Sequence, residues 1–151
     1  MLLRKGGLPL VNATLAYRAS ENDFSCSSYH KAVDGVAPTI TLVKTPSTVF
    51  GCYLNCKITA TNDWIPDVSR KSFIFSLTRG SIHRLKDDDG KLKAAFGGSK
   101  GPQIGSGCDF YLGDSCDRSF SSGSRLGGSY EPPNGLAYRS AEADNYLGGS
   151  R

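Results

Sequence analysis

Long apolar runs are the first thing that this sequence of 151 residues lacks. No stretch approaches the roughly 20 consecutive apolar residues that cross a bilayer, so we expect no transmembrane segment. Residues 1–7 place an apolar tip before their charges, which is the wrong order for a secretory signal. We therefore expect a cytoplasmic protein.

Clustered positive charge is also missing. The chain has 18 Lys and Arg against 14 Asp and Glu, a net charge of +4, but its basic residues are scattered. Lys91 and Lys93 come nearest to a cluster. A surface that follows nucleic-acid phosphates needs Lys and Arg gathered in a patch with exposed aromatic rings. We expect a solvated basic surface and no nucleic-acid partner.

The cysteines show no paired spacing. There are five of them, an odd number at irregular intervals: Cys26, Cys52, Cys56, Cys108 and Cys116. Cys52 and Cys56 lack the tight spacing of zinc knuckles, and no histidine follows them at ligand distance. This pattern favours reduced thiols that pack in the interior of a cytosolic protein over a disulfide framework. We expect no metal and no other cofactor.

The most strongly patterned stretch that is present covers residues 72–77. Phe73, Phe75 and Leu77 alternate there with Ser72 and Ser76. Alternation with a period of two predicts a central β-strand whose apolar side chains share one buried face.

Further strands are predicted where β-branched and aromatic residues gather, at residues 15–18, 39–44, 49–54, 82–85, 91–96 and 108–112. A turn at residues 45–48 makes the second and third of them a hairpin, and Asp89-Gly90 predicts another hairpin between the fourth and fifth. Irregular connections are expected at residues 55–70, 97–107 and 113–135.

Two short helices are predicted near the ends of the chain. Ser25 is the expected N-cap of the first, which ends at Asp34-Gly35. Ser140 is the expected N-cap of the second, which runs to Gly148-Gly149 with Ala143, Tyr146 and Leu147 on its inner face. The whole pattern predicts a mainly β (α+β) fold, an antiparallel two-sheet β-sandwich with two short peripheral helices.

One catalytic motif occurs, the G-x-S-x-G pattern around Ser99. An α/β-hydrolase would place a helix after this serine and a histidine later in the chain. Pro102 follows instead, and both histidines, His30 and His83, come earlier. The pattern therefore indicates a glycine-rich connection between strands.

A second lead is the pairing of Cys26 with His30, which can share one face of the first helix. An imidazole beside a thiol activates it, but an orienting third group is not evident. We expect the chain not to be an enzyme, and the alternative of a cysteine- or serine-dependent enzyme rests on Cys26 or Ser99.

Six segments, taken in order, resemble the TLDc domain family: residues 15–24, 34–44, 49–53, 72–77, 101–102 with 105–112, and 141–143 with 147–150. The resemblance implies a β-sandwich with two helices and an intracellular location. It also implies a link to oxidation resistance and to binding and regulating the vacuolar proton pump. The family has no established catalytic chemistry.

The resemblance divides the chain into a lead-in segment, residues 1–14, and a single TLDc-like domain, residues 15–151. Cys52 stands where the family often has a second glycine, and the chain stops at Arg151 where the family usually continues into one more strand. We expect the absence of that strand to leave a sheet edge that can pair with a strand of another molecule.

Binding residues are expected in the long connections, because loops on a rigid scaffold carry most recognition. The partner-binding candidates are Trp64, Arg118, Phe120, Arg125 and Glu142. The resulting hypothesis is a non-catalytic module that docks on a protein partner in a large multi-subunit assembly, such as the vacuolar proton pump. The alternative is a structural subunit built permanently into a large complex.

Overall fold

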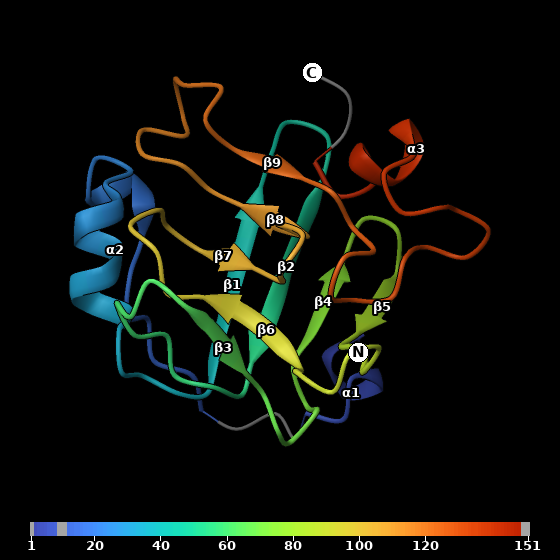
Figure 1. Cartoon of the computed structure of the whole chain (residues 1–151). Helices are drawn as coiled ribbons and strands as arrows, with labels where there is room; N and C mark the ends of the chain where they lie inside the picture. Colours follow the sequence, from blue (N-terminus) through green and yellow to red (C-terminus); the bar gives the residue numbers. More distant parts are fainter. Residues whose placement is uncertain (1, 9–11, 149–151) are drawn as a thin grey trace.

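Two antiparallel sheets form the framework of the part of the chain that the computed structural model describes, residues 2–8 and 12–148 (Figure 1). The helical elements are α1 (Leu2–Lys5), the short 3-10 helix η1 (Ala19–Glu21), α2 (Cys26–Val33) and α3 (Ala141–Asp144). The strands are β1 (Thr39–Lys44), β2 (Val49–Leu54), β3 (Trp64–Pro66), β4 (Phe73–Ser76), β5 (Ser81–Arg84), β6 (Lys93–Phe96), β7 (Gln103–Ile104), β8 (Phe110–Tyr111) and β9 (Gly123–Ser124).

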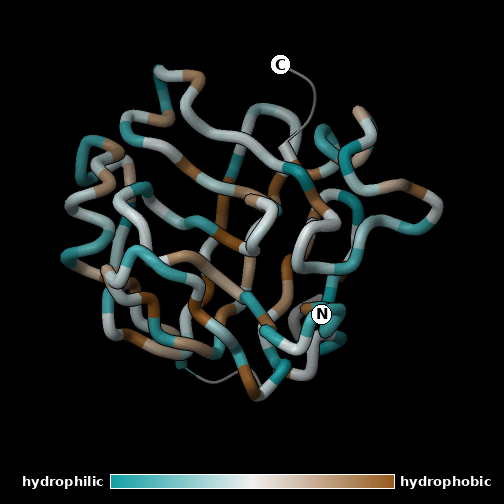
Figure 2. The backbone as a smooth tube through the Cα atoms, in the orientation of Figure 1, coloured by the Kyte–Doolittle hydropathy of each residue, from teal (hydrophilic) through white to brown (hydrophobic). Residues whose placement is uncertain are grey.

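The sheets pack as a sandwich, which confirms the fold predicted from the sequence. The first sheet has the order β1-β2-β4-β5, and the second has the order β3-β6-β7-β8-β9. The main core lies between them and includes Phe50, Ile74, Ile104, Phe110 and Tyr130. Many hydrophobic segments lie in the interior of the molecule, whereas the outer loops are mixed, with hydrophilic, neutral and a few hydrophobic residues (Figure 2). The predicted helices are α2 and α3, and α1 adds one turn within the lead-in segment.

Strand β4 is buried on both faces, which corrects the expected division into a buried and an open face. Ile74 points into the main core, whereas Phe73 and Phe75 form a second cluster with Tyr53 on the outer face of the sheet. Leu8 packs against this outer cluster and helps to cover it. Leu77, expected to be buried, is 46% exposed.

The first predicted hairpin is confirmed and the second is wrong. β1 and β2 pair antiparallel with the bounds expected from their β-branched residues. β5 and β6 lie in different sheets, so the segment between them crosses the sandwich. Asp89-Gly90 does make a turn, with Gly90 at a φ of +68°, but a local turn signal does not decide whether its flanking strands pair.

Other differences concern short elements. Residues 15–18 form no strand, and three strands lie within connections that were expected to be irregular: β3, β7 and β9. Helix α3 ends at Asp144, short of the expected Gly148, and Gly149 lies outside the described residues. Helix α2 agrees with the prediction, since the Ser25 side chain accepts a hydrogen bond from the Ser28 N–H at 3.3 Å.

Candidate functional site

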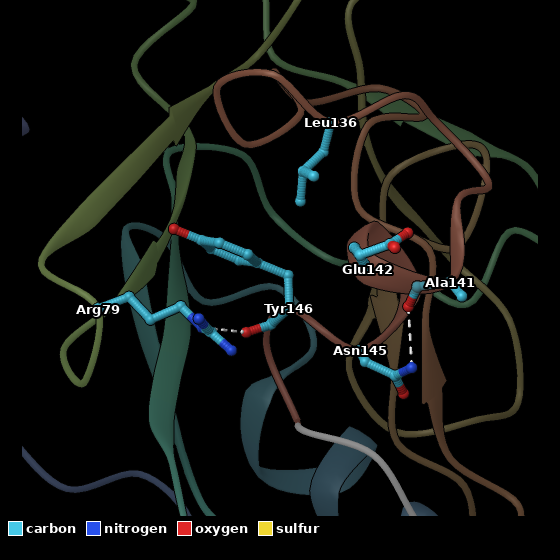
Figure 3. Close-up of a pocket in the computed structure, with 6 residues that line it drawn as sticks. All are labelled: Arg79, Leu136, Ala141, Glu142, Asn145 and Tyr146. Atoms are coloured by element: carbon cyan, nitrogen blue, oxygen red, sulfur yellow. Dashed lines mark hydrogen bonds between the residues drawn. The ribbon is translucent and has the colours of Figure 1, made fainter.

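A surface groove of about 420 Å³ lies between α3 and the turn that joins β4 to β5 (Figure 3). Its lining residues are Arg79, Leu136, Ala141, Glu142, Asn145 and Tyr146. Arg79 comes from the turn, and the other five come from the segment that contains α3. The groove is therefore a tertiary feature that joins distant parts of the sequence.

One wall of the groove is a stacked pair. The Arg79 guanidinium lies 4.5 Å from the centre of the Tyr146 ring, and its Nε donates a hydrogen bond to the Tyr146 carbonyl oxygen at 2.9 Å. Both contacts hold the guanidinium at a fixed position, so a ligand that binds it loses little side-chain freedom. Arg79 is thus a preorganised cation at the surface.

The opposite wall is α3, which is short but well anchored. The Ser140 side chain accepts a hydrogen bond from the Ala143 N–H at 3.2 Å, and Asn145 Nδ2 donates to the Ala141 carbonyl at 2.8 Å. The Ser124 hydroxyl of β9 donates to the Asp144 carbonyl at 2.6 Å. The first two bonds stabilise the helix itself, and the bond from Ser124 ties it to the second sheet.

Behind the stacked pair lies a buried histidine. His83 is 3% exposed and its ring makes an edge contact with Tyr146, with centroids 5.4 Å apart. Its Nδ1 faces the Glu131 carbonyl at 3.1 Å, and its Nε2 faces the Ser81 hydroxyl at 2.9 Å. Burial lowers the pKa of His83. A neutral ring that donates from Nδ1 and accepts at Nε2 satisfies both contacts.

A buried carboxylate holds the segment that leads to the groove. The Asp109 side chain is fully buried and accepts hydrogen bonds from the backbone N–H groups of residues 127–130, at 2.8 to 3.4 Å. Burial raises the pKa of Asp109 to about 6, so desolvation outweighs the hydrogen bonds that favour the ionised form.

The segment that Asp109 holds also seals the edge of the first sheet. The Lys86 N–H donates to the Ser129 carbonyl at 2.8 Å, and the Glu131 N–H donates to the Arg84 carbonyl at 2.8 Å. Residues 127–131 therefore tie β5 to the end of β8 and start the connection to α3.

Four of the five predicted binding residues lie around β9. Arg118 and Phe120 belong to the loop that leads into β9, Arg125 follows it directly, and Glu142 is on α3, which β9 anchors. Phe120 is 85% exposed. We call residues 113–125, α3 and the groove the β9 rim. Its charges have both signs, with Arg79 and Glu142 on opposite walls of the groove.

Trp64 lies away from the rim. It stands on β3, where its ring packs on Phe96 at a centroid distance of 4.6 Å with Lys93 Nζ 5.9 Å from the ring. Trp64 is partly buried. Trp64 thus lies at the β3 edge of the second sheet, opposite the edge formed by β9.

Cys26 and His30 both turn toward the connection between β6 and β7. Cys26 Sγ accepts a hydrogen bond from the Gly101 N–H at 3.0 Å, and His30 Nε2 lies 2.5 Å from the Lys100 carbonyl oxygen. His30 Nδ1 faces Asp34 at 2.8 Å, so the ring has the orienting carboxylate that sequence reasoning missed. Burial raises the pKa of the Cys26 thiol, opposite to the shift that activates a nucleophile.

Ser99 is exposed in a bend between two antiparallel strands. Gly97 is the first glycine of the G-x-S-x-G pattern. A Cβ atom at this position would lie 2.0 Å from the Thr59 carbonyl oxygen. The glycine is thus required by close approach of two backbones.

Two classes of feature are absent from residues 2–8 and 12–148. No three or more His, Cys, Asp or Glu side chains converge in a group that could hold a metal ion. Among the helices described, none is both long and apolar enough to span a bilayer.

Sequence reasoning identified Glu142 but missed Arg79, His83 and Asp109 as parts of this region. Arg79 and His83 carry no local signal, because their roles depend on Tyr146, more distant in the chain. Asp109 did carry a local signal in the sequence. It is a carboxylate inside the apolar run at residues 108–112, and if that run is buried the carboxylate needs hydrogen-bond donors.

Comparison with protein-family models gives one match, to the TLDc domain, over residues 7–144. No curated protein and no solved structure matches the chain. The matched range covers both sheets, α2 and the whole of α3.

Proposed function

We propose that this chain, which belongs to the TLDc domain family, is a non-catalytic cytoplasmic module that docks on a large protein assembly through the β9 rim. TLDc domains generally mediate protein interactions and are linked to oxidation resistance. The assembly that we propose is the vacuolar proton pump, which other members of the family bind and regulate.

The groove supports docking because its two walls carry opposite charges beside an aromatic ring. Arg79 is stacked on Tyr146, and Glu142 is exposed on α3. A protein segment with an acidic and a basic side chain can pair with both walls while an apolar residue covers the ring. Arginine and tyrosine are enriched among the residues that dominate binding energies.

Support for a non-catalytic role comes from the two reactive residues. The thiol of Cys26 is 7% exposed and bonded to Gly101, and both ring nitrogens of His30 face other groups. Neither nitrogen is placed to accept the Cys26 proton. Ser99 has no helix after it, whereas the nucleophile elbow of a hydrolase opens one.

A binding experiment with the purified water-soluble sector of the vacuolar proton pump tests this proposal. The wild-type chain is expected to bind, and Glu142→Lys should weaken binding by about tenfold or more, since a lost charge pair at the centre of an interface costs at least about 1.4 kcal/mol. Asp63→Lys is the control, because Asp63 is an exposed carboxylate next to β3, which lies at the opposite edge of the second sheet from β9.

The outcomes separate the two parts of the proposal. Wild-type chain that does not bind the sector rules out the pump as partner. Binding that Glu142→Lys, Arg118→Glu and Arg125→Glu all leave unchanged rules out the β9 rim as the docking surface, whatever the partner.

A further inference from the structure

The first sheet has one sealed edge and one open edge. At β5 the sheet is closed by the chain itself, through the hydrogen bonds of Lys86 with Ser129 and of Glu131 with Arg84. At the other end is β1, and within residues 2–8 and 12–148 no strand pairs with its far side. A strand edge of this kind presents a row of unpaired N–H and C=O groups.

The register of the hairpin shows which groups these are. The Thr45 N–H donates to the Thr48 carbonyl at 2.9 Å across the turn, so these opposing residues are a hydrogen-bonded pair. Hydrogen-bonded pairs alternate along an antiparallel ladder, so Val43, Thr41 and Thr39 also direct their N–H and C=O groups toward β2. The N–H and C=O groups of Ile40, Leu42 and Lys44 therefore point away from the sheet.

The side chains of Ile40 and Leu42 form an exposed apolar stripe, at one end of which stands the charge of Lys44. Ile40 is 48% exposed and Leu42 is 61% exposed, and Lys44 follows them on the same face. Ile40 stands beside Tyr53 and Leu42 beside Gly51, so the stripe continues the outer apolar cluster of the sheet. Monomeric proteins usually protect such an edge with charges or proline.

Lys44 gives this edge a charge preference. None of the six ion pairs formed by the described residues includes Lys44. An antiparallel pair of two β1 edges centred on Leu42 would place each Lys44 opposite an Ile40 of the other copy, with no carboxylate between two chains of net charge +4. A second copy is therefore a poor occupant, and an acidic segment is a good one.

We propose that the β1 edge binds an extended strand of a partner protein, with apolar residues at alternate positions to cover Ile40 and Leu42 and a carboxylate to pair with Lys44. Only an extended backbone supplies donors and acceptors at the spacing of this edge, so an amphipathic helix on the same stripe would leave them unpaired. This surface lies at the opposite edge of the first sheet from β5, shares no residue with the β9 rim and does not depend on the function proposed for the rim.

Amide hydrogen exchange in the full chain, followed by NMR, tests the proposal. The probe is a short capped peptide of alternating valine and threonine with one glutamate placed to face Lys44, and the control peptide has lysine there. In the free chain the Ile40, Leu42 and Lys44 amides should exchange much faster than those of Thr41 and Val43. The glutamate peptide should slow the three fast amides by about tenfold or more, and the lysine peptide should slow them less.

Two substitutions complete the test. Leu42→Lys should abolish protection by the peptide, whereas Val68→Lys, at an 83% exposed apolar position outside β1, should not. Protection of the three amides in the free chain at all concentrations would mean that the chain covers its own edge, and protection that grows with protein concentration would mean pairing with a second copy. Either result, or no protection by the glutamate peptide, overturns the proposal.

Discussion

Asp109 is the residue whose replacement should disturb this fold most informatively. Its Oδ1 accepts from the N–H groups of Gly127 and Gly128, both at 2.9 Å, and from that of Tyr130 at 3.4 Å, while Oδ2 accepts from Ser129 at 2.8 Å. In Asp109→Ala these donors lose their acceptor, and an unpaired buried N–H costs about 1–3 kcal/mol. The substitution also removes the cost of burying a carboxylate, which offsets part of the destabilisation. We expect the free energy of unfolding to fall by about 2–5 kcal/mol in total.

Asp109→Asn separates hydrogen bonding from charge. Its amide oxygen can replace Oδ1 and keep three bonds, whereas its NH₂ group faces the Ser129 N–H, so the loss should be about 1–3 kcal/mol. Urea unfolding followed by fluorescence of the single tryptophan, Trp64, measures both values. An Asp109→Ala variant within about 0.5 kcal/mol of wild type, with an unchanged urea slope, would refute the reasoning.

The pH dependence of the free energy of unfolding shows whether ionisation of Asp109 stabilises or destabilises the fold. Burial raises the pKa of Asp109 to about 6 from 3.8, so the folded state binds this proton more tightly than the unfolded state. The stability from this group is fully present below pH 3.8 and is lost as the pH rises through about 6. Between pH 7 and pH 5 the wild type should gain about 1 kcal/mol relative to Asp109→Asn, and a difference that does not change with pH would contradict the shift.

Two further predictions concern the outer cluster and the thiol. Phe75→Ala should lower the free energy of unfolding in urea by about 3–5 kcal/mol, because the Phe75 ring is 1% exposed and its centroid lies 6.1 Å from that of Phe73. A decrease no larger than that caused by Val68→Ala would show that the outer cluster contributes little to stability. Any peroxide consumption or ester hydrolysis by the chain should be the same in Cys26→Ser and Ser99→Ala as in wild type. Turnover that either substitution removes would refute the non-catalytic role that we propose.

The elements that sequence reasoning found are those with a strong local pattern. β1 and β2 are rich in β-branched and aromatic residues around a short turn, and α2 has a serine cap. β3, β7 and β9 have two or three residues each, which is too short for any periodicity, and they exist because the neighbouring strands of their sheet pair with them.

Which face of β4 meets the main core could not be predicted from its alternation. A period of two shows that Phe73 and Phe75 share a face, but it does not show that residues near the N-terminus cover that face from outside. The groove was out of reach for a similar reason, because Arg79 and Tyr146 are brought together only by the packing of the two sheets. Glu142 was among the candidates named from the sequence and lines the groove, and its role in binding stays a prediction.

The two proposed binding surfaces should respond differently when Asp109 is replaced. Residues 127–131, which Asp109 holds, close the sheet at β5 and begin the segment that reaches the groove, so the position of α3 depends on that carboxylate. β1 lies at the opposite edge of the first sheet and is fixed by its pairing with β2. A local loss of hydrogen bonds loosens the segment that these bonds hold before it disturbs a distant strand. A variant such as Asp109→Asn that stays folded should therefore weaken partner binding at the β9 rim, while the β1 edge keeps its geometry.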